Sequence, residues 1–434
     1  MYSRAEPQEI KRDRLGNPLA EALPYARGKI LSDTQDDIRK LSKAWRLIRK
    51  RIEEQGLRSV FNFSGLERKI VPPSGSEDPL DDEISPALFF DKLRAVALSH
   101  LGGNQEIHDV AVFNRMAAAT LATHLALVRP GEVVLGVSAS YSHPTVVRAA
   151  KLAGAKFVDT KGRDAFATAL RREEKVSLVV LTRMAVTYDI LPVEEMTEII
   201  RLAKMRQIPV YADDAGGARV GPAVLNQPKM LELGVDVGAT GLDKYGCKGP
   251  RAGLMAGEKG IVAKIRAKGF ELGLEARPML YGAIVRSLGA YHPSNVLSLV
   301  ETTKLVGVEL RKKFGKRLVE NAVTAQLLAE DILEIAMERA RVTSAPIVPY
   351  EATAALSMLL LRDYGILTVH FAGLPPGTGD LLVKFVPPDT LNRFGGASRF
   401  AEAVDASLNR LADIITDARA IENLLAQRQR MNPA

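Results

Sequence analysis

Cysteine is almost absent from the sequence, and no long apolar run occurs in it. Cys247 is the one cysteine in 434 residues, which excludes a disulfide scaffold and a cysteine-rich metal site and is typical of a reducing compartment. No stretch approaches the ~18 uninterrupted apolar residues of a membrane span. Residues 1–13 are too polar for the apolar core of a secretory signal. We therefore expect a cytoplasmic protein with no membrane partner.

Several other site signatures are also missing. Apart from His143, the histidines show no metal-ligand spacing such as H-x-x-x-H, so we expect no metal. The glycines between residues 246 and 257 do not form G-x-G-x-x-G after a strand, which argues against dinucleotide binding. With 47% hydrophobic and 25% charged residues, the chain has the composition of an ordinary globular protein.

The net charge of +8 is concentrated in one segment. Residues 38–52 read I-R-K-L-S-K-A-W-R-L-I-R-K-R-I, with seven basic residues and no acidic one. Ile38, Leu41, Trp45, Ile48 and Ile52 fall on one stripe of a helix, which predicts that this stripe docks and that the basic residues take the other face. The basic face is either a contact for nucleic acid or an acidic surface, or a solvated face of a docking helix.

The order of elements predicts an α/β protein. A polar arm over residues 1–29 and a turn-rich loop over residues 71–81 precede an alternation of short apolar runs and amphipathic stretches. This alternation implies a mostly parallel sheet with helices on both faces, and ligands gather at the strand carboxyl ends of such sheets. The expected strands are 110–113, 133–137, 156–158, 178–181, 210–213, 235–239 and 252–256, and the expected helices are 116–127, 145–152, 164–172 and 194–204.

The C-terminal part predicts a smaller α+β domain. We expect a long helical region over residues 278–338, strands at 354–361, 366–370 and 382–386, and a closing helix over 400–425. The expected divisions are 1–70 for the arm and basic helix, 71–290 for the large domain, and 291–434 for an interdomain helix and the small domain.

Three features follow predicted strands of the large domain. Asp213 ends a buried strand in Y-A-D-D-A-G-G-A-R, where a carboxylate needs a cationic or hydrogen-bonding partner. Lys244 lies in T-G-L-D-K-Y-G-C-K-G-P-R-A-G after the next strand, and a partly desolvated lysine can form a Schiff base. Tyr141 and His143, in S-A-S-Y-S-H-P-T-V, offer a ring that could lie flat on a planar cofactor.

These features match what pyridoxal phosphate requires: a lysine imine, an acid against the pyridine nitrogen, and a phosphate cup. The expected cup is the turn from the first strand into the next helix, formed by Asn114, Arg115 and Met116. Free backbone N–H groups and the helix dipole favour a phosphate there.

From residue 59 to about 288 the sequence resembles the fold type I pyridoxal-phosphate enzymes, and within them the selenocysteine synthase-like branch. That branch includes bacterial seryl-tRNA selenium transferase and glucosaminate-phosphate ammonia-lyase. The residues that carry the resemblance are S-V-F-N-F-S-G-L, A-V-F-N-R-M-A-A-A-T-L, the A-D-D-A strand end, D-K followed by G-P-R-A-G, and the post-lysine helix over 278–291.

The resemblance implies pyridoxal 5'-phosphate as cofactor, with Lys244 as its Schiff-base lysine and catalytic residue. It implies Asp213 against the pyridine nitrogen, Asn114–Met116 at the phosphate, His143 at the ring, and Thr240 among the cofactor-binding residues. It further implies a homodimer or higher homo-oligomer. The expected reaction is α,β-elimination, as in an ammonia-lyase, or β-replacement, on an amino acid or amino sugar acid.

Departures from the family leave some residues open. The loop after Lys244 is one residue longer than the family pattern, so Lys248 is an alternative Schiff-base lysine. Arg183 or Thr187 could replace the asparagine that many relatives place near the cofactor's phenolic oxygen. For the substrate carboxylate, Lys384 stands where many relatives have an arginine, Arg393 and Arg399 are alternatives, and Arg277 could serve a neighbouring subunit.

Simpler interpretations exist for each motif. Lys244 and Asp213 could be a structural ion pair, His143 could cap the next helix, Asp214 could be a loop carboxylate, and Cys247 could be an inert thiol. The alternative functions are a tRNA-dependent selenium or sulfur transferase that uses the basic helix, an aminotransferase, a racemase or an aldolase, or a non-catalytic binding protein.

Overall fold

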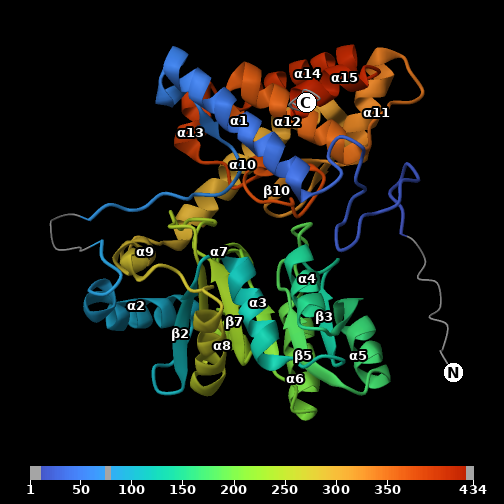
Figure 1. Cartoon of the computed structure of the whole chain (residues 1–434). Helices are drawn as coiled ribbons and strands as arrows, with labels where there is room; N and C mark the ends of the chain where they lie inside the picture. The colour runs from blue at the N-terminus through green and yellow to red at the C-terminus, as the bar shows by residue number, and fades with distance from the viewer. Residues whose placement is uncertain (1–10, 74–79, 427–434) are drawn as a thin grey trace, which may run out of the picture. The chain divides into compact units, whose positions relative to one another are not determined.

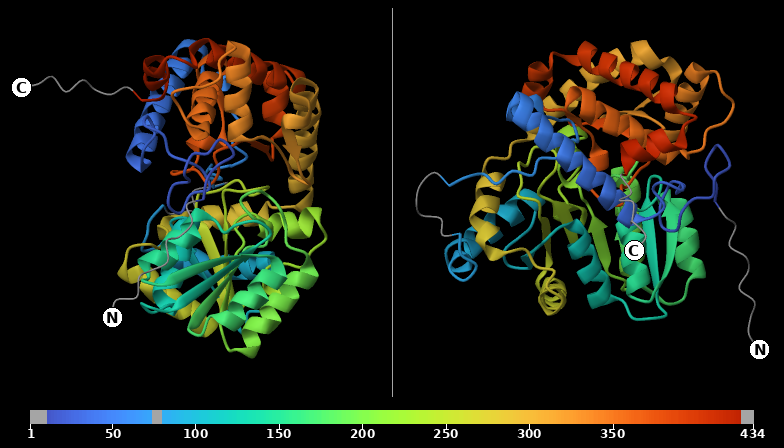
Figure 2. Two further views of the ribbon diagram at one scale, coloured as in Figure 1. Left: turned by 90° about the vertical axis from the view of Figure 1, so that its right-hand side faces the viewer. Right: turned by 45° about the horizontal axis from the view of Figure 1, so that its top comes forward.

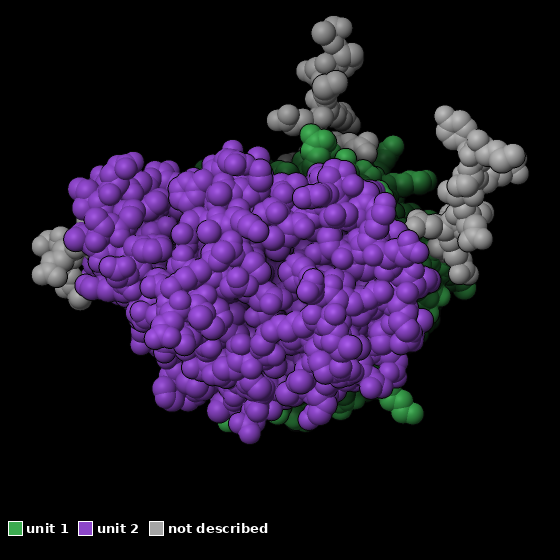
Figure 3. Space-filling model, turned by 90° about the horizontal axis from the view of Figure 1, so that it is seen from below, with its two compact units in different colours: residues 1–65, 300–434 green, residues 66–299 purple. Residues whose placement is uncertain are grey.

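The computed structural model describes residues 11–73 and 80–426, so parts of the expected arm and of the expected 71–81 loop lie outside the described residues. The chain forms two compact units (Figure 3). Unit 1 comprises Met1–Gly65 and Val300–Ala434, and unit 2 comprises Leu66–Leu299. The N-terminal segment therefore shares a unit with the C-terminal residues. No helix in the described ranges is long and apolar enough to cross a membrane.

Unit 2 is built on a seven-stranded sheet in the order β2-β8-β7-β6-β5-β3-β4. Strand β8 is antiparallel to both of its neighbours, and all other neighbouring pairs are parallel, so the predicted mostly parallel sheet is confirmed. The strands are β2 (His108–Phe113), β3 (Val133–Ser138), β4 (Lys156–Lys161), β5 (Val176–Leu181), β6 (Val210–Asp213), β7 (Val237–Gly241) and β8 (Gly253–Glu258).

Helices cover both faces of the sheet (Figures 1 and 2). Alternate residues of most strands enter two different hydrophobic cores. In β2, Val110 and Val112 pack on one face, and Ala111 and Phe113 on the other, as the period of two in a strand requires. Residues of α2 (Ser85–Leu101), α5 (Gly162–Arg172), α6 (Val193–Met205), α7 (Gly217–Val224) and α9 (Tyr281–Gly289) complete the first core, and residues of α3 (Met116–Leu127), α4 (Pro144–Leu152) and α8 (Lys259–Glu271) complete the second.

Unit 1 holds a three-stranded antiparallel sheet, a short parallel pair and several helices around α12 (Pro349–Tyr364). The sheet order is β12-β10-β9, and β1 pairs with β11. The other elements are α1 (Thr34–Gln55), β1 (Phe61–Asn62), α10 (Pro293–Phe314), β9 (Leu318–Glu320), β10 (Thr324–Leu327), α11 (Ala329–Ala340), β11 (Ile366–Leu367), β12 (Leu381–Lys384), α13 (Pro388–Phe394), α14 (Ala397–Ile414) and α15 (Ala418–Leu425).

The sequence predictions fail mainly in unit 1. Residues 354–361, expected as a strand, lie in α12, every residue of which is buried from Pro349 to Leu361. A helix that is buried on all sides shows no amphipathic period. A short apolar stretch of such a helix therefore cannot be distinguished from a buried strand by its sequence pattern. The expected helix over 278–338 is interrupted by β9 and β10. The expected strand at 366–370 is a strand only at Ile366–Leu367 and becomes a 3-10 turn from Val369, and the closing helix is two helices.

The predicted docking stripe of the basic helix is also wrong. Helix α1 buries Asp37, Lys40 and Ala44, whereas Ile38 is 51% exposed and Trp45 is 59% exposed. The polar side chains are retained inside by specific partners: Asp37 pairs with Arg27 at 2.8 Å, and Lys40 Nζ donates to the Tyr350 hydroxyl at 3.2 Å. The apolar stripe therefore lies at the edge of the docking face: Ile38 and Trp45 remain accessible, whereas the other members of the stripe are half-buried.

Candidate active site

The predicted cofactor residues, all in unit 2, lie at or just after the carboxyl ends of strands, at one edge of the large sheet. Strands β2, β3, β6 and β7 run in the same direction, so their carboxyl ends meet at that edge. Asp213 ends β6, and Lys244 follows β7 in the next loop. The Asn114–Met116 turn follows β2, and His143 follows β3. The topology thus brings the predicted residues of this unit to a common edge.

Asp213 is a desolvated acid at the centre of this edge. Its carboxylate is only 6% exposed, and burial raises its pKa to about 6, although the positive charge of Lys244 acts in the opposite direction. The neighbouring carboxylate of Asp214 raises the pKa further. An acid held in this way gains most from a cationic partner, such as a protonated ring nitrogen.

Lys244 and Lys248 lie in different surroundings. The side chain of Lys244 is 21% exposed, and its Nζ lies 3.6 Å from Asp243 Oδ1. Nζ packs against Gly241, where an added Cβ would come to 2.5 Å from it. Lys248 is exposed, and its charge acts on the pKa of Glu67. Lys244 thus pairs with Asp243 and its charge acts on the pKa of Asp213, whereas Lys248 acts on a different acid.

The loop that carries Lys244 is paired along one side with the segment Leu66 to Lys69. The Glu67 amide donates to the Asp243 carbonyl, and the Lys69 amide to the Lys248 carbonyl, both at 2.9 Å. Leu66 forms a bridge with Lys244, and Arg68 Nε donates to Asp243 Oδ2 at 2.8 Å. These contacts restrict the positions open to the lysine.

A group of arginines forms a cationic region beside this loop. Burial lowers the pKa of Arg251 to about 10, and repulsion from Arg68 and Arg115 lowers it further, whereas Asp243 opposes the shift. Gly253 lets β8 approach the Arg115–Met116 backbone closely, because a Cβ there would lie 2.8–2.9 Å from its atoms. Guanidinium groups that repel one another at a helix start can be stabilised by a dianion such as a phosphate.

The other predicted cofactor residues have local partners. Asn114 is exposed, and its Nδ2 donates to the Gly273 carbonyl at 3.3 Å. Arg115 occupies the N-cap position of α3 without a side-chain capping bond, and Met116 begins that helix. The Thr240 hydroxyl is fully buried, where it donates to the Ala215 carbonyl and accepts from Arg219 Nη1, both at 3.2 Å.

His143 caps α4. Its Nδ1 accepts a hydrogen bond of 3.1 Å from the Thr145 amide, so the capping interpretation describes an interaction that is present. The half-buried ring can still present a face to a ligand, and cofactor stacking by His143 stays a prediction.

The proposed substitutes for the family's asparagine are occupied elsewhere. Arg183 forms a buried ion pair of 3.0 Å with Asp214 and donates to the Pro228 carbonyl at 2.7 Å. The Thr187 hydroxyl donates to Asp189 Oδ2 at 2.8 Å. Asp214 is therefore a structural partner of Arg183.

The residues predicted for the substrate carboxylate are divided between the two units. In unit 2, Arg277 is an exposed partner of Asp82. In unit 1, Lys384 is buried at the end of β12, Arg393 donates to the Arg58 carbonyl, and Arg399 lies over the Phe394 ring with 5.2 Å to its centroid. Their assignment to the substrate stays a prediction.

Two features of this edge were not predicted: the contact between two tyrosines, and the burial of Arg219, which the sequence offered only as a possible ligand of phosphate or of a substrate acid or as a surface arginine. The hydroxyls of Tyr188 and Tyr245 lie 2.6 Å apart, and both tyrosines have a positive φ, 67° and 46°, which is uncommon for aromatic residues. Arg219 is completely buried beside the Lys244 loop. Only the positions of Tyr245 next to Lys244, and of Arg219 after the A-D-D-A-G-G segment, could have indicated them.

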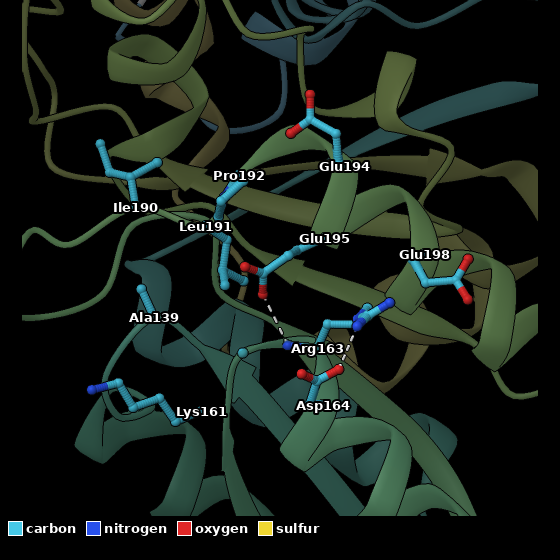
Figure 4. A pocket seen from close by; sticks show the side chains of 11 residues that line it. Ala139, Lys161, Arg163, Asp164, Ile190, Leu191, Pro192, Glu194, Glu195 and Glu198 are labelled. Carbon is cyan, nitrogen blue, oxygen red and sulfur yellow. Dashed lines mark hydrogen bonds and ion pairs between the residues drawn. The ribbon is translucent and has the colours of Figure 1, made fainter.

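A separate pocket of about 760 Å³ lies near the carboxyl ends of β3 and β4 (Figure 4). Glu194, Glu195 and Glu198 line it together with Arg163 and Asp164, and the Glu195 carboxylate accepts from the Arg163 amide at 2.9 Å. None of the predicted cofactor residues lines this pocket. In residues 11–73 and 80–426, no group of three or more His, Cys, Asp or Glu is placed to hold a metal ion.

Comparison with known proteins identifies relatives along most of the chain. A "UPF0425 pyridoxal phosphate-dependent protein" of Methanothermobacter thermautotrophicus is 29% identical over 88% of this chain and 94% of its own length. L-seryl-tRNA(Sec) selenium transferase of Carboxydothermus hydrogenoformans is 28% identical over 32% of each chain. No family model matches the sequence.

The same fold occurs in solved structures. N-succinyldiaminopimelate aminotransferase of Mycobacterium tuberculosis superposes with a TM-score of 0.56 at 16% identity, covering 84% of this chain and 96% of that one. The predicted family resemblance and fold class are therefore confirmed. The chain has the fold of the type I pyridoxal-phosphate enzymes, and its relatives include proteins named for that cofactor and members of the selenocysteine synthase-like branch.

Proposed function

We propose that this chain is a pyridoxal 5'-phosphate-dependent lyase or transferase with Lys244 as its Schiff-base lysine and Asp213 as the partner of the pyridine nitrogen. The observation that carries the proposal is the placement of a buried acid at the end of β6 and of a partly exposed lysine in the loop after β7, the neighbouring parallel strand. The charge of this lysine also acts on the pKa of the acid. Both lie at the strand edge where ligands of this architecture bind.

The residues present fit this cofactor. The charge of Lys244 offsets the burial of Asp213 only in part, and a protonated ring nitrogen supplies a further cation. The cluster of Arg68, Arg115 and Arg251 lies beside the start of α3, where backbone N–H groups also favour a phosphate. When bound, the cofactor supplies an electron sink for charge that develops at the substrate α-carbon.

Lys244 has a second role in this proposal. As a free amine it is the group that accepts or returns the proton of the substrate α-carbon. Asp213 keeps its negative charge next to the ring nitrogen and so favours the protonated ring. We assign elimination or replacement at the β-carbon of an amino acid or amino sugar acid, because the sequence relatives include a named selenium transferase. Transamination, racemisation and aldol cleavage are the competing reactions.

Titration with pyridoxal phosphate tests the lysine assignment. The wild type is expected to develop the visible absorbance band of lysine-bound cofactor, and Lys244→Ala is expected to lose it. Lys248→Ala is the matched control, since Lys248 is exposed and belongs to the same loop. A band that survives in Lys244→Ala and disappears in Lys248→Ala would overturn the assignment.

A substrate screen tests the reaction. Amino acids and amino sugar acids are added to the cofactor-loaded protein, and spectral shifts, ammonia and 2-oxo acid are measured. Elimination predicts equal amounts of ammonia and 2-oxo acid, and replacement predicts product only when a nucleophile is added. Release of a 2-oxo acid that requires a second 2-oxo acid as acceptor would instead identify an aminotransferase.

A tRNA-dependent transferase is the second candidate, and the accessible edge of α1 favours it. Trp45 is exposed, and Arg39, Arg46, Arg49 and Lys50 are exposed on the same helix. An accessible indole beside cations can stack on a base while the cations contact phosphates. The selenium transferase relative is named for a tRNA substrate.

Trp45 is the only tryptophan, so its fluorescence reports directly on this surface. Binding of unfractionated tRNA is expected to quench it, with an affinity that falls with salt. Replacing Arg46 and Arg49 by Gln is expected to reduce the log–log salt slope by roughly two, about one per phosphate contact. Absence of quenching and of salt-dependent binding at low ionic strength would remove this candidate and leave the basic residues as a solvated face.

A further inference from the structure

Arg219 connects both ends of the segment that carries Lys244. It lies on α7, and its guanidinium is 0% exposed. On one side of Lys244, Nη1 donates to the Gly241 carbonyl at 2.9 Å and to the Thr240 hydroxyl at 3.2 Å. On the other side, Nε donates to Cys247 Sγ at 3.0 Å. One side chain therefore ties residues before the lysine to a residue after it.

A buried arginine in this position is costly. Among the described residues no carboxylate forms an ion pair with Arg219, and its Nη2 has no hydrogen-bond partner. A guanidinium removed from water without an anion is strongly disfavoured, whereas an apolar residue would avoid this penalty. The charge of Asp214 acts on Arg219 without forming an ion pair and offsets part of this cost. The three acceptors that Arg219 reaches offset a further part, and all of them belong to the strand end or loop around Lys244.

Two other sets of contacts hold the loop, and they involve different residues from those that Arg219 reaches. The Leu66 to Lys69 segment pairs with Asp243 and Lys248 through backbone atoms. Tyr245 is joined to Tyr188, which precedes α6. Neither set of contacts reaches Cys247 or the end of β7.

We propose that Arg219 is a positioning residue that closes the Lys244 loop onto the end of β7 and thereby sets where the lysine amine lies. Its consequence for the cofactor rests on the proposed function. Its effect on the loop itself does not, because the contacts involve only residues of this chain.

Cys247 is the only thiol of the chain and is itself a partner of Arg219, so its alkylation reports on opening of the loop. The full-length protein is treated with iodoacetamide at fixed pH, and labelling is followed by mass spectrometry. Arg219→Met and Arg219→Lys are expected to label faster than wild type by on the order of tenfold or more, with the larger effect in Arg219→Met. Labelling at low urea separates local opening, whose rate is nearly independent of urea, from global unfolding.

Arg206→Met is the matched control. Arg206 is an arginine of the same unit that donates to the Leu170 carbonyl, far along the chain from the loop. We expect Cys247 in the Arg206→Met variant to be labelled at the wild-type rate. Unchanged labelling in both Arg219 variants, or equal acceleration in Arg206→Met, would overturn the proposal. If Arg219→Met does not fold, Arg219→Lys and Thr240→Val, which removes one acceptor, provide the same comparison.

The position of the amine is read in the cofactor-loaded protein. The midpoint pH of the visible band is expected to shift in Arg219→Lys and to stay unchanged in Arg206→Met, a difference that loss of stability alone would not produce. Faster labelling with an unshifted midpoint would overturn the positioning role. Failure of the wild type to attach cofactor would refute the proposed function, whereas the labelling rates judge the loop contacts independently.

Discussion

Asp213→Asn is expected to stabilise the cofactor-free protein although it removes the acid that we assign to the pyridine nitrogen. Burial raises the pKa of Asp213 from 3.8 to about 6, a shift of about two units. One unit corresponds to 1.36 kcal/mol, so holding this group ionised in the folded state costs about 3 kcal/mol at pH 8. An asparagine does not ionise, and the substitution should recover most of that free energy.

The sign of the pH dependence follows from the same shift. Between pH about 6 and 3.8 the folded state binds the proton of Asp213 more tightly than the unfolded state. The contribution of this group to the free energy of unfolding therefore rises as the pH falls through that window and is lost as the pH rises through it. The advantage of Asp213→Asn should be full at pH 8 and should shrink toward pH 4.

Urea unfolding of the cofactor-free full chain measures this difference. Far-UV circular dichroism is the suitable probe, because Trp45 lies in unit 1 and Asp213 in unit 2. The difference in free energy of unfolding between Asp213→Asn and wild type is measured at pH 8 and at pH 5. Subtracting the second difference from the first separates the ionisation of Asp213 from other effects of the amide. A variant that is less stable than wild type at pH 8, or a difference that does not change with pH, would refute the reasoning.

Three other experiments test further parts of the structure. Gly253→Ala places a Cβ 2.8–2.9 Å from the Arg115–Met116 backbone and is expected to weaken pyridoxal phosphate binding by on the order of tenfold, measured by spectral titration; unchanged affinity would argue against a phosphate at this turn. Arg251→Gln is expected to weaken binding of inorganic phosphate and of the cofactor, whereas Arg277→Gln, on an exposed arginine paired with Asp82, should not; equal effects would count against the arginine cluster. In unit 1, Asp37→Asn leaves Arg27 and the buried Lys40 without their anion and should cost about 3 kcal/mol or more, whereas Lys40→Met keeps the Arg27–Asp37 pair and should cost much less. Trp45 fluorescence in urea follows this comparison, and a reversed order would contradict it.

The alternation in the large domain could be predicted from the sequence because its strands and helices differ in period. The strand over 210–213 and the helix over 116–127 have the predicted bounds, and most others differ by a few residues. Asp213 and Lys244 were accessible to the same reasoning, since each follows a short apolar strand. Parallel topology alone then places them at one edge.

Features that depend on distant partners could not be predicted. The stripe of α1 that contains Trp45 follows helical periodicity, yet Arg27 and Tyr350 provide partners for Asp37 and Lys40 and so select a different buried face. Arg68, Arg115 and Arg251 come from three separate segments, and no spacing connects them. The contacts of Arg219 likewise depend on how α7 packs against the loop after β7.

Reduction with borohydride, followed by peptide mapping, tests the central claim most directly. Borohydride fixes pyridoxal phosphate to the lysine that holds it, and mass spectrometry of the digested full-length protein identifies that lysine. We expect the label on Lys244 and none on Lys248. A label on Lys248, or no label after saturation with cofactor, would contradict it.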